Sequence, residues 1–252
     1  MVIKVYPSAA DFENLSRVRT IASTHANDFN YSNVVVNKPW GYEYLWYQNP
    51  SVAVWMLYLE KSKATSLHSH LRKRTSLIVV SGQVVCSTLE DRHKLSMADS
   101  VVLEPCVFHT TQAISDEGAF VIEVETPPMK GDLVRLKDNF GREKSGYEKQ
   151  SQYSYDLSAY YYQPYNHENE KSLHIFGELC FELHSVQDFD EITRICTSKL
   201  LVVPFLGRLA NGKNILLETG EAVHPNNLDL SKLPSFFPPV ELMVIDNANF
   251  ER

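Results

Sequence analysis

The chain has 252 residues, of which 44% are hydrophobic and 22% are charged, and its formal net charge is −7. This composition is ordinary for a globular protein with one large core or two smaller ones. The acidic balance argues against a nucleic-acid surface, which normally shows a basic face. The longest apolar runs, at residues 77–80 and 200–203, are far shorter than the roughly 20 residues of a membrane helix. Residues 1–7 lack the apolar stretch of a signal peptide, so we expect a cytoplasmic protein without nucleic-acid or membrane partners.

The first predicted element is a short helix within residues 8–26, and residues 1–33 are assigned to this N-terminal helical segment. Ser8 can cap the helix, and apolar residues recur at three-residue spacing, at Phe12, Leu15, Val18 and Ile21. This spacing is typical of an amphipathic helix.

From residue 34 the pattern changes to short β-branched and aromatic runs that are separated by Gly, Pro, Asn, Asp or Lys/Ser breaks. The runs occupy residues 42–47, 52–59, 76–80, 83–89, 100–103 and 120–124. Many short strands at regular spacing are typical of a sandwich or barrel rather than of alternating β and α units. The predicted fold class is therefore all-β, with a barrel over residues 34–142.

Residues 143–171 are predicted to connect this barrel to a β-rich C-terminal domain at residues 172–252. The Tyr-rich run at 153–165 argues against disorder, and it would either cover the barrel mouth or form a dimer contact. The C-terminal residues contain a possible internal repeat, because 76–84 resembles 199–209 and 94–105 resembles 214–225. We therefore predict a second, degenerate barrel. The alternative is that two β-rich stretches look alike by composition.

Three histidines form the candidate functional site. His68 and His70 lie two residues apart at a predicted strand, so both imidazoles can face the barrel interior, and His109 follows Pro105 about forty residues later. Three imidazole ligands with an open position suit a catalytic Zn, Mn, Ni or Fe ion. An HxH pair alone is more often solvated or part of a core, but the Gly82 turn and the later Pro-x-x-x-His element favour a metal site.

One expected ligand is missing from this pattern. Such sites usually add a carboxylate five residues after the second histidine, where this chain has Thr75, a poor ligand for a divalent metal. Glu123 and Glu125 share one face of a later strand and are candidates for the missing oxygen. Carboxylates at alternate strand positions are more often surface charges, so both interpretations stay open.

Three markers in order make a family resemblance recognisable. They are VNKPWGYE at 36–43, TSLHSH at 65–70 running into VVSG at 79–82, and IEVE at 122–125 followed by GDLVRLKDNFGR at 131–142. The set resembles the type II phosphomannose isomerases of the cupin superfamily, including the isomerase domain that follows mannose-1-phosphate guanylyltransferases. The resemblance covers residues 36–142, a little under half of the chain.

This resemblance implies a cupin jelly-roll barrel in which His68, His70 and His109 match three metal-ligand positions. Thr75 stands where the family places its fourth ligand, a glutamate. Cys106 and Ala98 stand at positions where the family usually has glycine.

The implied chemistry is an aldose–ketose isomerisation. A metal can polarise the carbonyl of an open-chain sugar, while a carboxylate moves a proton between the neighbouring carbons. The catalytic candidates, which the sequence does not rank, are Glu43, Glu123 and Glu125. The substrate-binding candidates are Lys38, Trp40, Arg135 and Arg142.

The substrate-binding candidates each have a structural alternative. Arg135 and Arg142 either hold a phosphate or form salt bridges with nearby acidic residues, Asp132, Asp138 or Glu143. Trp40 either stacks on a sugar ring or closes the barrel core. The run 72–74 (RKR) is most simply a solvated turn, although it would also draw an anionic substrate to the barrel mouth.

The first functional hypothesis is a metal-dependent isomerase or epimerase of a sugar or sugar phosphate, serving polysaccharide or nucleotide-sugar metabolism. The second is a non-catalytic carbohydrate-binding or regulatory cupin, which the absence of a glutamate at Thr75 supports. The third is a cupin oxygenase with Fe(II) on three histidines, which would place Cys106 close to the metal. Open sheet edges favour association, so a homodimer is expected.

Overall fold

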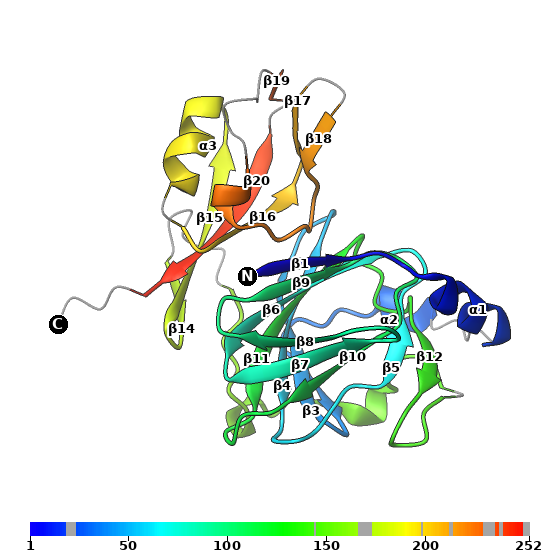
Figure 1. The fold of residues 1–252 in the computed structure, drawn as a ribbon. Helices are drawn as coiled ribbons and strands as arrows, with labels where there is room; N and C mark the ends of the chain where they lie inside the picture. The colour runs from blue at the N-terminus through cyan, green and yellow to red at the C-terminus, as the bar shows by residue number, and fades with distance from the viewer. Residues whose placement is uncertain are drawn as a thin grey trace.

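The computed structural model describes residues 1–18, 24–143, 145–165, 173–197, 199–211, 214–228, 235–236 and 239–248. A β-barrel holds the N-terminal part of the chain, and a smaller unit of strands with one helix packs beside it (Figure 1). The helices of the described residues are α1 (Ala9–Arg17), α2 (Thr24–Asp28) and α3 (Phe189–Cys196). They are too short and polar to cross a membrane.

The strands of the first part run in chain order from β1 to β12. They are β1 (Val2–Val5), β2 (Val35–Lys38), β3 (Gly41–Gln48), β4 (Ala53–Leu59), β5 (Leu67–Ser69), β6 (Arg74–Ser81), β7 (Gln83–Thr88), β8 (Arg92–Ser96), β9 (Ser100–Leu103), β10 (His109–Ala113), β11 (Ala119–Thr126) and β12 (Val134–Lys137). The six strands predicted from the sequence are confirmed as β3, β4, β6, β7, β9 and β11. The predicted runs did not include the shorter strands β1, β2, β8, β10 and β12.

Two sheets face each other across the barrel. One has the order β1-β9-β6-β11-β4-β3-β2-β13, and the other has the order β12-β5-β10-β7-β8. After β4 the chain alternates between the sheets, except for the β7–β8 hairpin. This is the jelly-roll topology, so the predicted cupin fold is confirmed.

The central strands are buried on both faces. In β4, Trp55 and Leu57 belong to the core inside the barrel, whereas Val54 and Met56 belong to a second core on the outer face of the larger sheet. The second core includes residues of the C-terminal unit, such as Phe181. This double burial explains why these strands read as continuous apolar runs rather than as alternating ones.

The C-terminal unit repeats the pairing of the barrel. Its elements after the connection are β14 (His174–Phe176), β15 (Leu179–Val186), α3, β16 (Leu201–Leu206), β17 (Leu209–Asn211), β18 (Asn214–Leu217), η3 (Pro225–Asn227), β19 (Ser235–Phe236) and β20 (Val240–Asn247). The order β14-β15-β20-β16 matches β3-β4-β11-β6, and β18-β17-β19 matches β8-β7-β10. A bridge between Val202 and Val223 stands where β6 pairs with β9.

The predicted repeat is therefore present in the strand order, with one strand replaced. Helix α3 takes the place of β5, the strand that carries His68 in the first barrel. Among the described residues, the group at His68, His70 and His109 is the one set of side chains arranged to hold a metal. The degenerate repeat has thus lost the element on which the first barrel builds its site.

The N-terminal helix is capped as predicted, but its buried face differs. Ser8 and Asp11 form a capping box at the start of α1. Asp11 is 3% exposed, and its carboxylate accepts a hydrogen bond from the Phe108 amide at 2.8 Å, while Phe12 is 54% exposed. A polar anchor to the loop before β10 holds this helix in place of the expected apolar stripe. Ile21 lies outside the described residues.

The Tyr-rich connection covers the outer face of the larger sheet. It contains η1 (Gln150–Gln152), β13 (Tyr153–Ser154), which pairs with β2, and η2 (Leu157–Ala159). The Tyr161 amide then donates to the Tyr42 hydroxyl at 3.2 Å, and the Tyr165 amide donates to the Trp46 carbonyl at 2.8 Å. Residues 160–165 therefore run along β3 rather than over the barrel mouth.

The outermost strands of the two barrel sheets are short. β1 and β13 have four and two residues, and β12 and β8 have four and five. Arg92 and Lys94 on β8 are exposed. Short and charged edge strands are a common protection against pairing between the edges of two sheets. The homodimer stays a prediction, and it would have to form through a surface other than these edges.

Candidate metal centre

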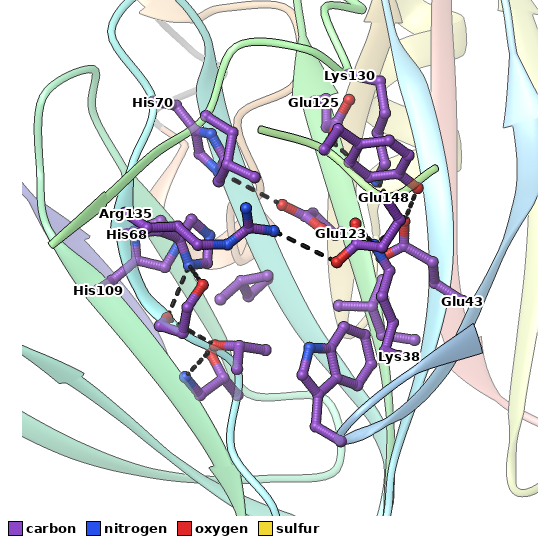
Figure 2. A pocket seen from close by; sticks show the side chains of 18 of the residues that line it. Lys38, Glu43, His68, His70, His109, Glu123, Glu125, Lys130, Arg135 and Glu148 are labelled. Atoms are coloured by element: carbon purple, nitrogen blue, oxygen red, sulfur yellow. Dashed lines mark hydrogen bonds and ion pairs between the residues drawn. The ribbon is translucent and has the colours of Figure 1, made fainter. Parts of the chain in front are cut away.

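The three histidines lie together on one wall of the barrel interior (Figure 2). In the smaller sheet, His109 at the start of β10 pairs directly with His68 of β5, and His70 follows one residue after that strand ends. The strand alternation turns His68 and His70 to the same side, as predicted. One nitrogen of each ring lies within 4.8 Å of the others.

Each imidazole is oriented by a backbone carbonyl. The Nδ1 atoms of His68, His70 and His109 lie 2.8, 2.6 and 3.1 Å from the carbonyl oxygens of Ser66, Asp132 and Val107. A carbonyl only accepts hydrogen bonds, so each Nδ1 carries the proton. The lone pair of each Nε2 is therefore available to a metal, as in metal-binding histidines whose other nitrogen is held by a carbonyl.

The electrostatics of the cavity keep the three rings neutral. Burial is the largest cause that lowers the pKa of all three histidines, to about 4 for His109. The positive charge of Lys73 also contributes to the lowered pKa of each ring. The Nε2 of His70 is buried without a hydrogen-bond partner among the described residues. A divalent cation would satisfy this orphaned acceptor, so the three residues fit a metal ion.

Thr75 does not contribute an oxygen to this site. It is fully buried on β6 and does not line the cavity. Of the two proposed replacements, Glu123 approaches the histidines, with its Oε1 3.8 Å from the His70 Nε2. Glu125 is held instead by Lys73, whose Nζ is 2.6 Å away.

The opposite wall carries three more buried carboxylates, and each one is paired with cations (Figure 2). Lys130 lies 3.4 Å from Glu125 and 2.9 Å from Glu43, and its ammonium sits 3.6 Å from the centre of the Trp55 ring. Lys38 continues the chain by pairing with both Glu43 and Glu148. The result is a row of alternating charges along the wall.

This row separates the three catalytic candidates. Burial raises the pKa of Glu43, but Lys130 and Lys38 outweigh it and lower the pKa to about 2. Burial is likewise outweighed at Glu125, where Lys130 and Lys73 lower the pKa. At Glu123, burial prevails and raises the pKa. Among the described residues, Glu123 is the cavity carboxylate without a Lys or Arg nitrogen within 4.0 Å, and it is the best placed to accept and return a proton.

The paired carboxylates predict acid sensitivity. The pKa of Glu43 is about 2 in the folded protein, against 4.5 ordinarily, so its stabilising contribution is complete above about pH 4.5 and is lost as the pH falls toward 2. We expect the free energy of unfolding, measured by urea denaturation, to fall over that window. Glu43→Gln should make the fall smaller, whereas Glu13→Gln on the exposed face of α1 should leave it unchanged. An equally steep fall in Glu43→Gln would contradict the assignment.

The arginines of the exit motif bind the protein itself. Arg142 forms ion pairs with Asp138 at 2.8 Å and with Glu148 at 2.6 Å. Arg135 donates to the carbonyls of Ser145 and Gly146 and pairs with Glu148 at 3.3 Å. Of the two alternatives, the geometry therefore favours salt bridges that fix the loop at 138–148 over a phosphate site.

Two other expectations need correction. Lys73 was interpreted as part of a solvated turn, but it is 2% exposed and lines the cavity. The carboxylate of Asp132 accepts the backbone amides of residues 71–73, and this turns the loop inward. Cys106 does not line the cavity; its thiol points to the Leu71 carbonyl at 3.9 Å. Its φ of 76° is a left-handed conformation that glycine adopts more readily than other residues.

All ten predicted site residues line one cavity, although their roles stay predictions. The centres of water molecules can occupy about 60 Å³ of this cavity. This is room for a few waters or a small ligand. The charged lining residues that were not predicted are Lys73, Lys130 and Glu148, and Tyr147 was also missed. Glu123 and Glu125 lie at alternate positions of β11, so the sequence could have indicated that both face the interior and require nearby cations. No local sequence signal indicated Tyr147 and Glu148.

Neither family models nor curated proteins match the chain. Among solved structures it is similar to KdgF from Halomonas sp., at 17% identity over 36% of this chain and 84% of that one, with a TM-score of 0.34. It is also similar to the capsular polysaccharide assembling protein CapF from Staphylococcus aureus, at 19% identity over 44% of this chain and 34% of that one, with a TM-score of 0.38. A third is an RmlC-like cupin from Shewanella frigidimarina, at 17% identity over 37% and 82% of the two chains, with a TM-score of 0.34. The chain spans about a third of the length of CapF, and no activity is transferred from these structures.

Proposed function

We propose that this cupin-fold protein is a metal-dependent enzyme that moves a proton beside the carbonyl group of a sugar or related hydroxy-carbonyl compound, as isomerases and epimerases do. One observation carries the proposal. Three neutral imidazoles each have one nitrogen within 4.8 Å of the others, and Glu123, which has no Lys or Arg partner among the described residues, lies 3.8 Å from the Nε2 of His70. A metal-binding set and a proton carrier are thus side by side in a buried cavity.

The residues divide the work between them. His68, His70 and His109 would hold a divalent ion, which when bound polarises the substrate carbonyl and acidifies the neighbouring C–H bond. Glu123 takes that proton and returns it to the adjacent carbon or to the opposite face. Its raised pKa, caused by burial, brings its proton affinity closer to that of a base working near neutral pH.

The other catalytic candidates have a supporting role in this scheme. Glu43 and Glu125 are already neutralised by lysines, and such carboxylates are weak bases. Trp40 is 5% exposed and lines the cavity. It therefore serves as a core residue whose face bounds the substrate space.

The first test is metal content. Wild-type protein, purified without chelators, is expected to carry about one equivalent of Zn, Mn, Ni or Fe by elemental analysis. His70→Ala should bind the metal more than about 100-fold more weakly, because even the loss of a group that only orients a ligand costs 10- to 100-fold. His93→Ala, which changes a histidine of β8 outside the cavity, is the matched control and should retain the metal.

The second test is proton exchange. In D₂O, the metal-loaded protein should incorporate deuterium beside the carbonyl of at least one member of a panel of aldoses, ketoses and their phosphates. No incorporation across the panel, with metal bound, would contradict the isomerase. No metal in the wild type, and equal ligand binding by His70→Ala, would favour the non-catalytic carbohydrate-binding alternative.

A three-histidine Fe(II) oxygenase is the second candidate. The observation that favours it is Thr75, which leaves the three histidines without a carboxylate in their group. Iron as the native metal, together with oxygen uptake, would support it. Cys106 no longer adds to this candidate, since it does not line the cavity.

A further inference from the structure

Lys73 is a buried cation that lies close in the chain to Thr75, the position of the missing metal ligand. The family glutamate would stand at Thr75, two residues further along the same segment. Here the segment instead presents an ammonium group to the cavity, 2% exposed and paired with Glu125 of the neighbouring strand at 2.6 Å. Thr75 lies directly opposite Glu125 in the β6–β11 pairing. The segment that has no carboxylate at Thr75 therefore supplies a cation to the cavity through Lys73.

Lys73 also has unused hydrogen-bonding capacity. An ammonium carries three N–H donors, and in the part of the chain that the structure describes Glu125 accepts one of them. The other cavity lysines are more committed. Lys130 contacts two carboxylates and the Trp55 ring, and Lys38 contacts two carboxylates. Lys73 is therefore the cavity lysine best able to bind an incoming anion.

The charge balance of the cavity also favours the binding of an anion. Five cationic side chains line it against four carboxylates, and Asp138, which pairs with Arg142, supplies a fifth, so these charges balance before a divalent ion is added. The three imidazoles are neutral, so they do not offset the charge of a divalent ion that they hold. Without a glutamate at Thr75, that charge has no protein carboxylate beside it except Glu123. Buried charge of one sign is costly unless an opposite charge accompanies it.

We propose that the substrate is a small anion, a hydroxy-carbonyl compound with a carboxylate group, and that Lys73 binds this carboxylate beside the three histidines. This inference rests on the proposed function for the histidine cluster and names the substrate class of the same site. The small volume of the cavity suits a compound of a few carbon atoms at its reactive end.

The test is calorimetric titration of the metal-loaded protein with lactate, a probe that carries the hydroxyl and carboxylate groups of the proposed substrate class, and with lactamide as its neutral twin. Lactate should bind and lactamide should bind at least 10-fold more weakly. Lys73→Met should weaken lactate binding by about 10- to 100-fold, the usual effect of losing a hydrogen bond to a charged group. Arg72→Met changes the exposed neighbouring cation and should leave binding unchanged. Equal binding of lactate to wild type and Lys73→Met, or equal binding of lactate and lactamide, would overturn the proposal.

A folding control is needed because Lys73→Met leaves Glu125 without its nearest cation. The double variant Lys73→Met/Glu125→Gln removes both charges, and it should fold with native circular dichroism yet still bind lactate weakly. Full lactate affinity in this variant would overturn the proposal.

The two proposals fail in different ways. If elemental analysis finds no metal, the proposed enzyme fails, while the metal-free protein should still bind lactate in a manner that depends on Lys73. If the metal is present and lactate binding ignores Lys73, the substrate class fails and the enzyme proposal stands.

Discussion

Glu123→Gln is expected to lower turnover by about 100- to 10,000-fold, the range for loss of a general acid–base group, while leaving the metal content unchanged. The amide keeps the shape of the side chain but cannot accept a proton. Glu123 is 8% exposed and lies between the histidines and the lysine-bearing wall (Figure 2), so bulk water is a poor substitute for it.

The measurement is solvent-deuterium incorporation at saturating substrate, with elemental analysis of the same samples. Glu117→Gln is the matched control, because Glu117 is exposed in the turn before the same strand and should be silent. A fall in both metal content and turnover would identify Glu123 as a ligand rather than as the proton carrier. Unchanged turnover would contradict its proposed role altogether.

Gly41→Ala is expected to lower the free energy of unfolding by about 3 kcal/mol, through steric overlap and backbone strain. Gly41 has a φ of 141°, and a Cβ there would lie 2.0 Å from the Tyr58 carbonyl oxygen. The partner is the backbone of β4, which cannot rotate away. The pairing of Gly41 with Leu59 of β4 and with Lys38 of β2 would therefore open at the edge of the cavity.

Urea denaturation of Gly41→Ala and Gly141→Ala would test this mechanism. Gly141 also has a positive φ, of 75°, but nothing lies within 4 Å of the position that its Cβ would take. Its substitution should cost only about 1–2 kcal/mol, the strain of a left-handed conformation alone. Equal losses in the two variants would show that close contact with Tyr58 is unimportant.

The close contact at Gly41 also explains one marker of the family resemblance. The PWG marker is recognisable because the chain must pass within van der Waals contact of β4 at Gly41, and only a residue without a side chain fits. Ala98 and Cys106 depart from the family glycines and adopt φ values of 61° and 76° all the same. The backbone course of the barrel is therefore kept even where the residue type is not.

The candidate site shows where prediction from sequence stopped. The two-residue spacing of His68 and His70 was enough to place both rings on one face, since strand alternation is a local property. The identity of the proton carrier was not accessible in this way. Glu43, Glu123 and Glu125 are equivalent in sequence, and they differ only in which lysines reach them across the barrel.

Lys73 was misread for the same reason. A run of three basic residues is usually solvated, and its neighbours Arg72 and Arg74 are exposed or half-buried. The carboxylate of Asp132, about sixty residues later, binds the amides of residues 71–73 and so sets the path of the loop. A contact over that distance in the chain leaves no mark in the local pattern.

The sequence by itself determined the positions of the longer apolar strands, the barrel, the repeat and the three histidines, because each depends on residue alternation, on turn residues or on spacing within a single strand. Tertiary structure alone decided that Glu123 is the carboxylate that lies near the histidines, that the arginines secure a loop, and that Lys73 lies buried in the same cavity. Those outcomes follow from charge pairing between strands that are distant in sequence. The energy of a buried charge depends on its partners in space, and a single chain read in order does not reveal them.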